Sequence, residues 1–133
     1  MAFTKPYRIN FSDSGEKYLE FLHEIINTPL KEELSLNGEF KAPHTQEFCE
    51  IIFYNSGNRM ARIGENEFMF SAGDIFVVRP DEEHAGKSVP CVLDRYYLHI
   101  SPDAFSDLKD GENLMNIFFG REKYSGNKIT PTA

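Results

Sequence analysis

The spacing of apolar residues changes along the chain, and the change predicts two kinds of element. After residues 1–12, which we expect to form an arm or a short edge strand, apolar side chains recur with a period near 3.6 at Tyr18, Phe21, Leu22, Ile25 and Ile26. This period predicts an amphipathic helix over residues 15–27. Asp13 and Glu16 fit its N-cap and capping-box positions, and Pro29 marks its end.

From Leu34 onward the pattern is that of β-strands. Aromatic and β-branched residues gather in short runs between Gly, Pro and Asn turns, which predicts strands over residues 48–54, 59–63, 67–70, 75–78 and 91–100. Short strands with a turn about every eight to ten residues are typical of an antiparallel sandwich or barrel. The sequence therefore predicts a mainly β fold.

After residue 100 the pattern becomes helical again. Ser101 and Pro102 fit the N-cap and N1 positions of a short helix that ends near Leu108. Asn113 is expected to cap a second helix over residues 114–119, which Gly120 ends, and residues 128–130 are expected to begin a strand. We expect three regions: an arm and helix over 1–33, a β-barrel over 34–101, and a helical segment with a truncated tail over 102–133.

Composition and charge narrow the class of protein. The chain has 133 residues and a net charge of -7, so a single domain without a nucleic-acid groove is expected. No apolar stretch is long enough to span a membrane and no signal peptide precedes the domain, which predicts a cytoplasmic protein with no membrane partner. Cys49 and Cys91 form no Cys-x-x-Cys pair, and we expect two reduced thiols on strands.

One strand face carries polar residues among apolar ones. Side chains at even spacing share a face of a strand, and here they are His44, Gln46, Phe48, Glu50, Ile52 and Tyr54. A buried polar group costs free energy unless it is hydrogen-bonded or coordinated. Inward-facing His, Gln and Glu therefore indicate a lined cavity, which His84 can join from a later strand.

Two alternatives remain for this face. His44, Glu50 and His84 together are a plausible ligand set for a divalent transition metal. Alternatively, His44 faces solvent at the start of the strand and Glu50 is paired with an arginine.

The last long strand offers a second set of polar groups. Arg95, Tyr97 and His99 share one face of it. An arginine supplies a fork of donors and a tyrosine a flat surface with a hydroxyl, as is usual in small-molecule pockets. The alternative is that Arg95 pairs with a surface carboxylate. No nucleophile elbow or phosphate loop is found elsewhere in the chain.

The spacing of these residues resembles the two motifs of the cupin family. Gly38, His44, Glu50 and Gly57 fall at the first motif's positions, with Gln46 in place of its second histidine. Gly73 and His84 match the second motif more weakly, with Ser88 at its asparagine position. The resemblance implies a cupin-like antiparallel β-barrel, or jelly roll, with short flanking helices.

Within the cupins, the chain is most similar to the effector-sensing N-terminal domain of AraC-type bacterial transcription regulators. The stretches that carry this similarity are residues 44–52, Arg62–Gly64, Ala72–Ile75, Pro80–His84 and Tyr97–Pro102. In that family the barrel binds a small effector, often a sugar, while later helices dimerise the domain and a C-terminal helix-turn-helix region binds DNA. The resemblance implies a homodimer as a further partner, and DNA contact only through a region missing from this chain. It also implies that Arg95 and Tyr97 meet the effector, with His84 nearby.

Three hypotheses follow. In the first, the domain is no enzyme, needs no cofactor, and binds a small-molecule effector through His44, Gln46, Glu50, His84, Arg95 and Tyr97. In the second, it is a small metallocupin enzyme, an isomerase or dioxygenase, that uses a divalent transition metal on His44, Glu50 and His84. In the third, it is a dimerisation module whose pocket is filled by Phe48, Ile52 and Tyr54.

Overall fold

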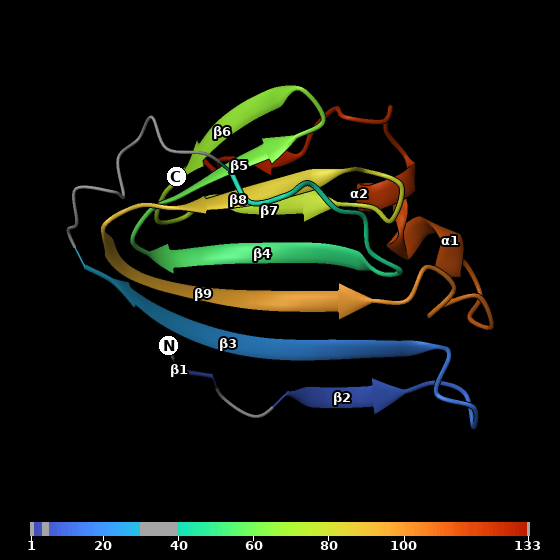
Figure 1. Ribbon diagram of the computed structural model, residues 1–133. Helices are drawn as coiled ribbons and strands as arrows, with labels where there is room; N and C mark the ends of the chain where they lie inside the picture. The colour runs from blue at the N-terminus through green and yellow to red at the C-terminus, as the bar shows by residue number, and fades with distance from the viewer. Residues whose placement is uncertain (1, 4–5, 30–39, 133) are drawn as a thin grey trace.

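The computed structural model of the chain describes residues 2–3, 6–29 and 40–132. In this part of the chain, ten strands form two antiparallel sheets that face each other, with two one-turn helices at one end (Figure 1). The larger sheet has the strand order β1-β3-β9-β4-β7-β10, with β2 also paired to β3, and the smaller has the order β6-β5-β8. The predicted mainly β barrel is confirmed.

The strand bounds show how the chain moves between the sheets. The larger sheet contains β1 Ala2–Phe3, β2 Tyr7–Asn10, β3 Tyr18–Thr28, β4 Cys49–Ser56, β7 Ile75–Val78, β9 Cys91–Ile100 and β10 Lys128–Ile129. The smaller sheet contains β5 Arg59–Ile63, β6 Asn66–Phe70 and β8 His84–Ser88. The strands predicted from residue 48 onward are confirmed to within two residues, and both cysteines are free and lie on strands, as expected.

The helix predicted over residues 15–27 is wrong. Residues 18–28 form β3, which pairs with β9 from Leu19 opposite Ile100 to Thr28 opposite Cys91. Apolar residues occur on both faces of β3, since Ile26 packs against the core whereas Phe21 and Ile25 are exposed, and their combined positions imitate a helical period. His23, which the predicted helix would have contained, stacks on Tyr96 and lies 2.6 Å from a carboxylate oxygen of Asp94.

The helix predicted over residues 102–108 is also absent. These residues form successive turns, in which the amides of Ala104, Ser106 and Leu108 each bond the carbonyl three residues earlier. The Ser101 hydroxyl accepts a hydrogen bond from the Tyr18 amide at 2.8 Å, so it does not cap a helix.

The later helix is split into two single turns. They are α1 Gly111–Leu114 and α2 Asn116–Phe119. Asn113 lies inside α1 and is not the predicted cap, whereas Gly120 is the C-cap of α2 as expected. The strand expected near residue 128 is confirmed as β10.

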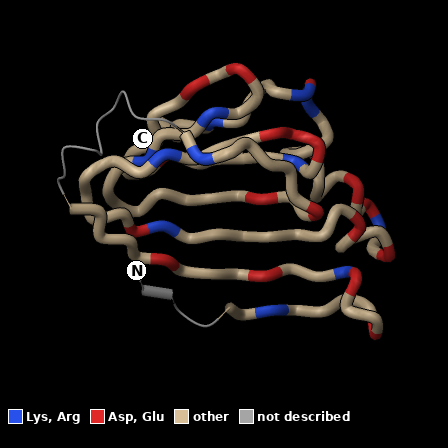
Figure 2. The backbone as a smooth tube through the Cα atoms, viewed as in Figure 1, with Lys and Arg blue, Asp and Glu red and all other residues tan. Residues whose placement is uncertain are grey.

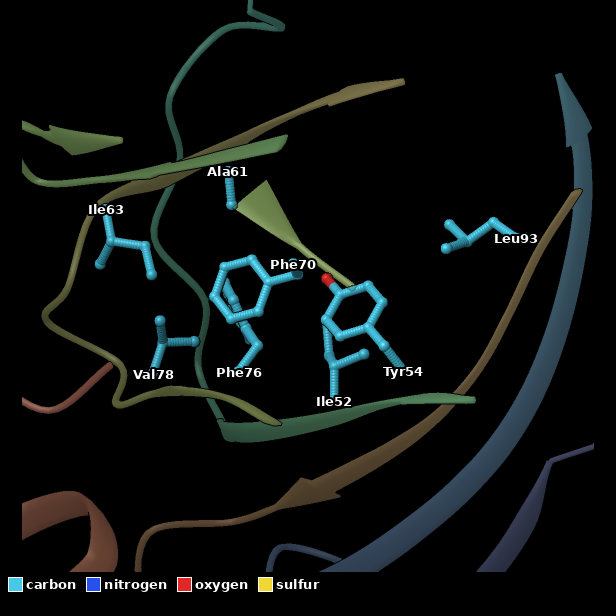
Figure 3. Close-up of a cluster of buried hydrophobic side chains, with 8 residues drawn as sticks. All are labelled: Ile52, Tyr54, Ala61, Ile63, Phe70, Phe76, Val78 and Leu93. Atoms are coloured by element: carbon cyan, nitrogen blue, oxygen red, sulfur yellow. The ribbon is translucent and has the colours of Figure 1, made fainter. Parts of the chain in front are cut away.

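A hydrophobic core fills the space between the two sheets. Figure 3 shows Tyr54 and Ile52 of β4 beneath Phe70, with Ala61 and Ile63 of the smaller sheet above. The rings of Tyr54 and Phe70 are stacked with their centroids 5.2 Å apart. Burial of such aromatic side chains is the main force that holds the sheets together.

Charged residues are dispersed over the surface. Figure 2 shows Lys and Arg scattered among Asp and Glu, without a continuous basic stripe in the described part of the chain. No helix within this part is long and apolar enough to cross a membrane. Gly38 and the predicted start of the barrel at residue 34 lie outside the described residues, so the division of the chain into three regions stays a prediction.

Candidate functional site

A cavity of about 200 Å³ lies between the two sheets beside the hydrophobic core. Its walls contain all six residues predicted to bind an effector, namely His44, Gln46, Glu50, His84, Arg95 and Tyr97. The remaining lining residues are Ile52, Tyr54, Arg59, Ala61, Phe76, Ala85 and Gly86. The sequence therefore predicted which side chains gather here; their role in binding stays a prediction.

Strand register explains why these residues meet. Residues opposite each other on antiparallel strands point to the same face of the sheet. The pairs between β4 and β9 are Glu50 with His99, Ile52 with Tyr97 and Tyr54 with Arg95. On the other side of β9, Glu24 of β3 is opposite Arg95. Three neighbouring strands thus place their polar residues on the face that lines the cavity.

Arg95 and Tyr97 are held by a buried carboxylate. Arg95 donates from Nε and Nη2 to Glu24 Oε1 at 2.9 and 2.7 Å, and the Tyr97 hydroxyl donates to the same oxygen at 2.8 Å. Glu24 is 5% exposed and Arg95 8% exposed. The alternative that Arg95 pairs with a surface carboxylate is therefore wrong. The pairing fixes the position of both side chains at the cavity wall.

Burial and neighbouring charges determine the protonation states of Arg95 and Tyr97. Burial alone would lower the pKa of Arg95, but Tyr97, Tyr54 and Glu24 together raise it. Burial raises the pKa of the Tyr97 hydroxyl. Arg95 is therefore charged and Tyr97 neutral at ordinary pH, so both act as hydrogen-bond donors.

The opposite wall is built from the segment before β4 and from β8. His44 and His84 exchange backbone hydrogen bonds at 2.9 and 3.0 Å, and their rings lie 4.4 Å apart. His44 is exposed, as one alternative expected, yet it still lines the cavity. Two buried atoms in this wall, Gln46 Oε1 and His84 Nε2, have no hydrogen-bond partner among the described residues.

His84 is held in a defined state. Its Nδ1 lies 3.0 Å from the carbonyl oxygen of Glu82, which requires Nδ1 to carry a proton and donate. Burial lowers the pKa of His84 below its ordinary value, so the ring is neutral near pH 7. Nε2 is then a buried acceptor of a cavity-lining residue without a donor among the described residues, and an unmatched buried acceptor is unfavourable until a ligand supplies a donor.

Glu50 has a different partner from the arginine that one alternative expected. Glu50 Oε2 lies 2.6 Å from His99 Nε2, so Glu50 is paired with a histidine and not with an arginine. In the described part of the chain, no group of three or more His, Cys, Asp or Glu residues is arranged to hold a metal ion. His44, Glu50 and His84 therefore do not form a coordination set in this arrangement.

The pocket is not filled by its own side chains. Phe48 stacks on His99 with ring centroids 4.1 Å apart and is not part of the cavity wall. Ile52 and Tyr54 pack into the core and form one side of the cavity, which stays open. The third hypothesis, in which these three residues fill the pocket, does not fit the structure.

Two important residues escaped the sequence analysis. Glu24 was placed on a helix, so its pairing with Arg95, 71 residues away, was not expected. Arg59 was seen only as the start of a strand, although it lines the cavity. Even spacing with Ala61 and Ile63, both buried in the core, was the available signal that Arg59 faces inward.

Comparison with known proteins supports the expected family. The model of the AraC-like ligand binding domain family matches residues 32–122. HTH-type transcriptional activator RhaR of Salmonella choleraesuis (strain SC-B67) is 35% identical over 48 residues, which is 36% of this chain. The match spans only 17% of the length of RhaR.

Solved structures show the same fold at low identity. The plu4264 protein from Photorhabdus luminescens has a TM-score of 0.51 at 16% identity, over 77% of this chain and 78% of that chain. A Cupin 2 conserved barrel domain protein from Salinispora arenicola CNS-205 has a TM-score of 0.51 at 13% identity, over 77% and 80%. These similarities show a cupin barrel, as the sequence motifs predicted.

Proposed function

The chain belongs to the AraC-like ligand binding domain family, and we propose that it binds a small hydroxylated effector in the cavity between its sheets. The bound effector would change the behaviour of a larger regulator, so the function is a coupling between binding sites and not a reaction. The effector would be held between two walls of the cavity. One wall carries Gln46 and His84, and the other carries Arg95 and Tyr97.

The observation that carries this proposal is the pair of buried acceptors without a donor. Gln46 Oε1 and neutral His84 Nε2 both lie in the wall of one cavity. Buried polar atoms in proteins nearly always have a partner, and exceptions call for an explanation. A ligand hydroxyl that donates to each atom supplies that partner.

The rest of the cavity suits the same class of ligand. Arg95 is fixed by its bonds to Glu24 and places a guanidinium charge at the cavity wall. Tyr97 and Tyr54 add aromatic surface to the wall. A volume of about 200 Å³ is below the roughly 300–1,000 Å³ of pockets for drug-sized ligands, which favours a molecule the size of a monosaccharide.

The regulatory setting rests on the relative. RhaR is by name an HTH-type transcriptional activator. We place this domain in a cytoplasmic transcription regulator that contacts DNA through a helix-turn-helix region, which is not among the elements described above. A homodimer is part of the same proposal.

The effector-binding hypothesis requires neither catalysis nor a cofactor. Glu24 holds and orients Arg95 and Tyr97 through hydrogen bonds, which is a positioning role and not a catalytic one. Elemental analysis of the purified protein separates this hypothesis from the metallocupin alternative. Stoichiometric Fe, Mn, Zn or Ni that is lost in His84→Ala would favour the enzyme.

A binding experiment with matched variants tests the proposal. Purified protein is titrated by calorimetry with a panel of monosaccharides, polyols and sugar acids. For a ligand that binds, Gln46→Ala should weaken affinity about 3- to 10-fold, because one hydrogen bond is lost. Glu47→Ala, at the neighbouring exposed position, is the control and should leave affinity unchanged. Equal affinity in wild type and Gln46→Ala would contradict the site assignment.

A further inference from the structure

Arg59 faces the cavity from the smaller sheet. It is the first residue of β5 and alternates with Ala61 and Ile63, whose side chains are buried in the core. Arg59 is opposite Ser88 on β8 and lines the same cavity as Arg95, which comes from the larger sheet. Two guanidinium groups therefore approach one small cavity from two sheets.

The two arginines differ in their partners. Arg95 is paired with Glu24, whereas Arg59 donates from Nη1 to the hydroxyl of Ser88 at 2.9 Å and forms no ion pair with any described residue. The guanidinium of Arg59 lies against Gly86, where an added Cβ would be 2.4 Å from Nη2. Gly86 thus leaves the space that the guanidinium occupies at the cavity wall.

The two carboxylates of the cavity region already have hydrogen-bond partners. Glu24 accepts from Arg95, and Glu50 lies 2.6 Å from a ring nitrogen of His99. Arg59 is the cation that is left without a carboxylate among the described residues of this wall. Burial, followed by the charge of Arg95, lowers the pKa of Arg59, so both desolvation and repulsion act on this guanidinium. A negative charge placed beside it would offset both effects.

We propose that Arg59 binds the acidic group of the effector, and that the effector is a small hydroxylated carboxylic acid of the sugar-acid class. The proposal rests on the effector-binding function above and specifies its ligand. A guanidinium fork matches the two oxygens of a carboxylate, and such charge-assisted bonds are stronger than neutral ones. The hydroxyls of the same molecule donate to Gln46 and His84 across the cavity.

The structure also argues against other anions. The cavity volume of about 200 Å³ is too small for a nucleotide or a coenzyme. A sugar phosphate carries the same kind of charge, and the experiment must separate it from a carboxylate.

The experiment compares each neutral sugar with its uronic and aldonic acid and with its phosphate. Calorimetric titrations use the wild type, Arg59→Met, Arg59→Lys and Arg62→Met. Arg62 is the matched control, since it lies on the same strand but forms an exposed pair with Glu67. Circular dichroism verifies that each variant is folded.

The expected result is a carboxylic acid that binds the wild type and Arg62→Met about 10- to 100-fold more tightly than its neutral sugar. Arg59→Met should abolish this preference and leave the neutral sugar's affinity within about twofold. Arg59→Lys keeps the positive charge but not the paired donors of the guanidinium, and it should retain part of the preference for the acid.

Three results would overturn the inference. They are a neutral sugar that binds as tightly as its acid, an acid preference that survives in Arg59→Met, and a panel in which no acid binds. A preference for the phosphate would overturn the carboxylate assignment. The effector-binding proposal is judged separately, because neutral-sugar binding that depends on Gln46 would support it even if Arg59 has no role.

Discussion

Two buried carboxylates each hold a guanidinium in this domain, but their surroundings differ. Glu24 accepts hydrogen bonds from Arg95 and Tyr97 on one oxygen, Oε1. Glu82 is fully buried and uses both oxygens: Oε1 accepts from the Arg79 amide and Arg121, and Oε2 from Arg121, the Tyr124 amide and Asn127. The first cluster borders a cavity, and the second is closed.

The difference separates a structural cluster from one that is available to a ligand. Both oxygens of Glu82 are matched by donors from the chain itself, which attaches residues 121–127 to the turn before β8, and only the buried Oδ1 of Asn127 has no partner among the described residues of this cluster. In the cavity wall, the acceptors Gln46 Oε1 and His84 Nε2 have no hydrogen-bond partner among the described residues. Burial of charge alone therefore does not mark a binding site; incomplete pairing at a cavity does.

The Glu82 cluster should be the more sensitive of the two to mutation. Glu82→Gln removes a buried charge that pairs with Arg121 and places an amide where the chain offers only donors. Loss of one partner of a buried ion pair typically reduces the free energy of unfolding by about 3–5 kcal/mol. Urea unfolding measures this loss. Glu83→Gln, at the neighbouring exposed position, should change stability by less than about 0.5 kcal/mol.

The sequence predicted the barrel where local signals agreed. From Cys49 to Ile100, β-branched and aromatic runs alternate with turns, and Gly57 and Gly73 adopt positive φ angles of 84° and 91°, which glycine favours. β3 was missed because it is paired on both sides and carries apolar residues on both faces. Periodicity alone could not separate it from a helix.

Even spacing along the sequence predicted part of the candidate site. Residues whose position depends on contacts with distant parts of the chain were missed. The even spacing of His44, Gln46 and Glu50 predicted a shared strand face; His44 and Gln46 instead lie in the segment before β4, yet all three line one cavity. The burial of Glu82 had no local signal, because it lies in the acidic run at residues 81–83 and its partners come from residues 121–127. Long-range pairing of this kind is fixed by the fold and not by neighbouring residues.

A smaller loss is expected at the cavity cluster. Glu24→Gln leaves Arg95 without its carboxylate, but the amide oxygen can still accept and the adjacent cavity admits solvent. We expect the free energy of unfolding to fall by about 1–3 kcal/mol, less than for Glu82→Gln. Urea unfolding of both variants in the same buffer makes the comparison. Equal losses of unfolding free energy would show that solvent in the cavity does not stabilise the unpaired guanidinium of Arg95.

The closed cluster should also respond to acid. Hydrogen bonds from Arg121, Asn127 and backbone amides outweigh the effect of burial and lower the pKa of Glu82 to about 2 from an ordinary 4.5. Its stabilisation is therefore complete above pH 4.5 and is lost as the pH falls towards 2. Between pH 6 and pH 3.5 the wild type should lose about 1 kcal/mol more than Glu82→Gln. Urea unfolding at both pH values measures these losses. Equal losses in the wild type and Glu82→Gln would contradict the lowered pKa of Glu82.

The smallest expected effect is the dependence of effector affinity on His84 protonation. Because the pKa of His84 is lowered below 6.5, Nε2 is a free acceptor at neutral pH and becomes protonated only at acid pH. Affinity for a bound hydroxylated ligand should be constant above pH 6.5 and fall about 3- to 10-fold once the ring is protonated, since one accepted hydrogen bond is lost.

Two variants separate His84 from its neighbour His44, whose ring lies 4.4 Å away. His84→Gln replaces the titrating acceptor with an amide oxygen, so calorimetric affinity should no longer fall at acid pH in this variant. His44→Gln removes the neighbouring imidazole ring and should preserve the fall. If His44→Gln instead abolishes the pH dependence, the exposed histidine controls binding and the unpaired Nε2 of His84 is not the acceptor for the ligand.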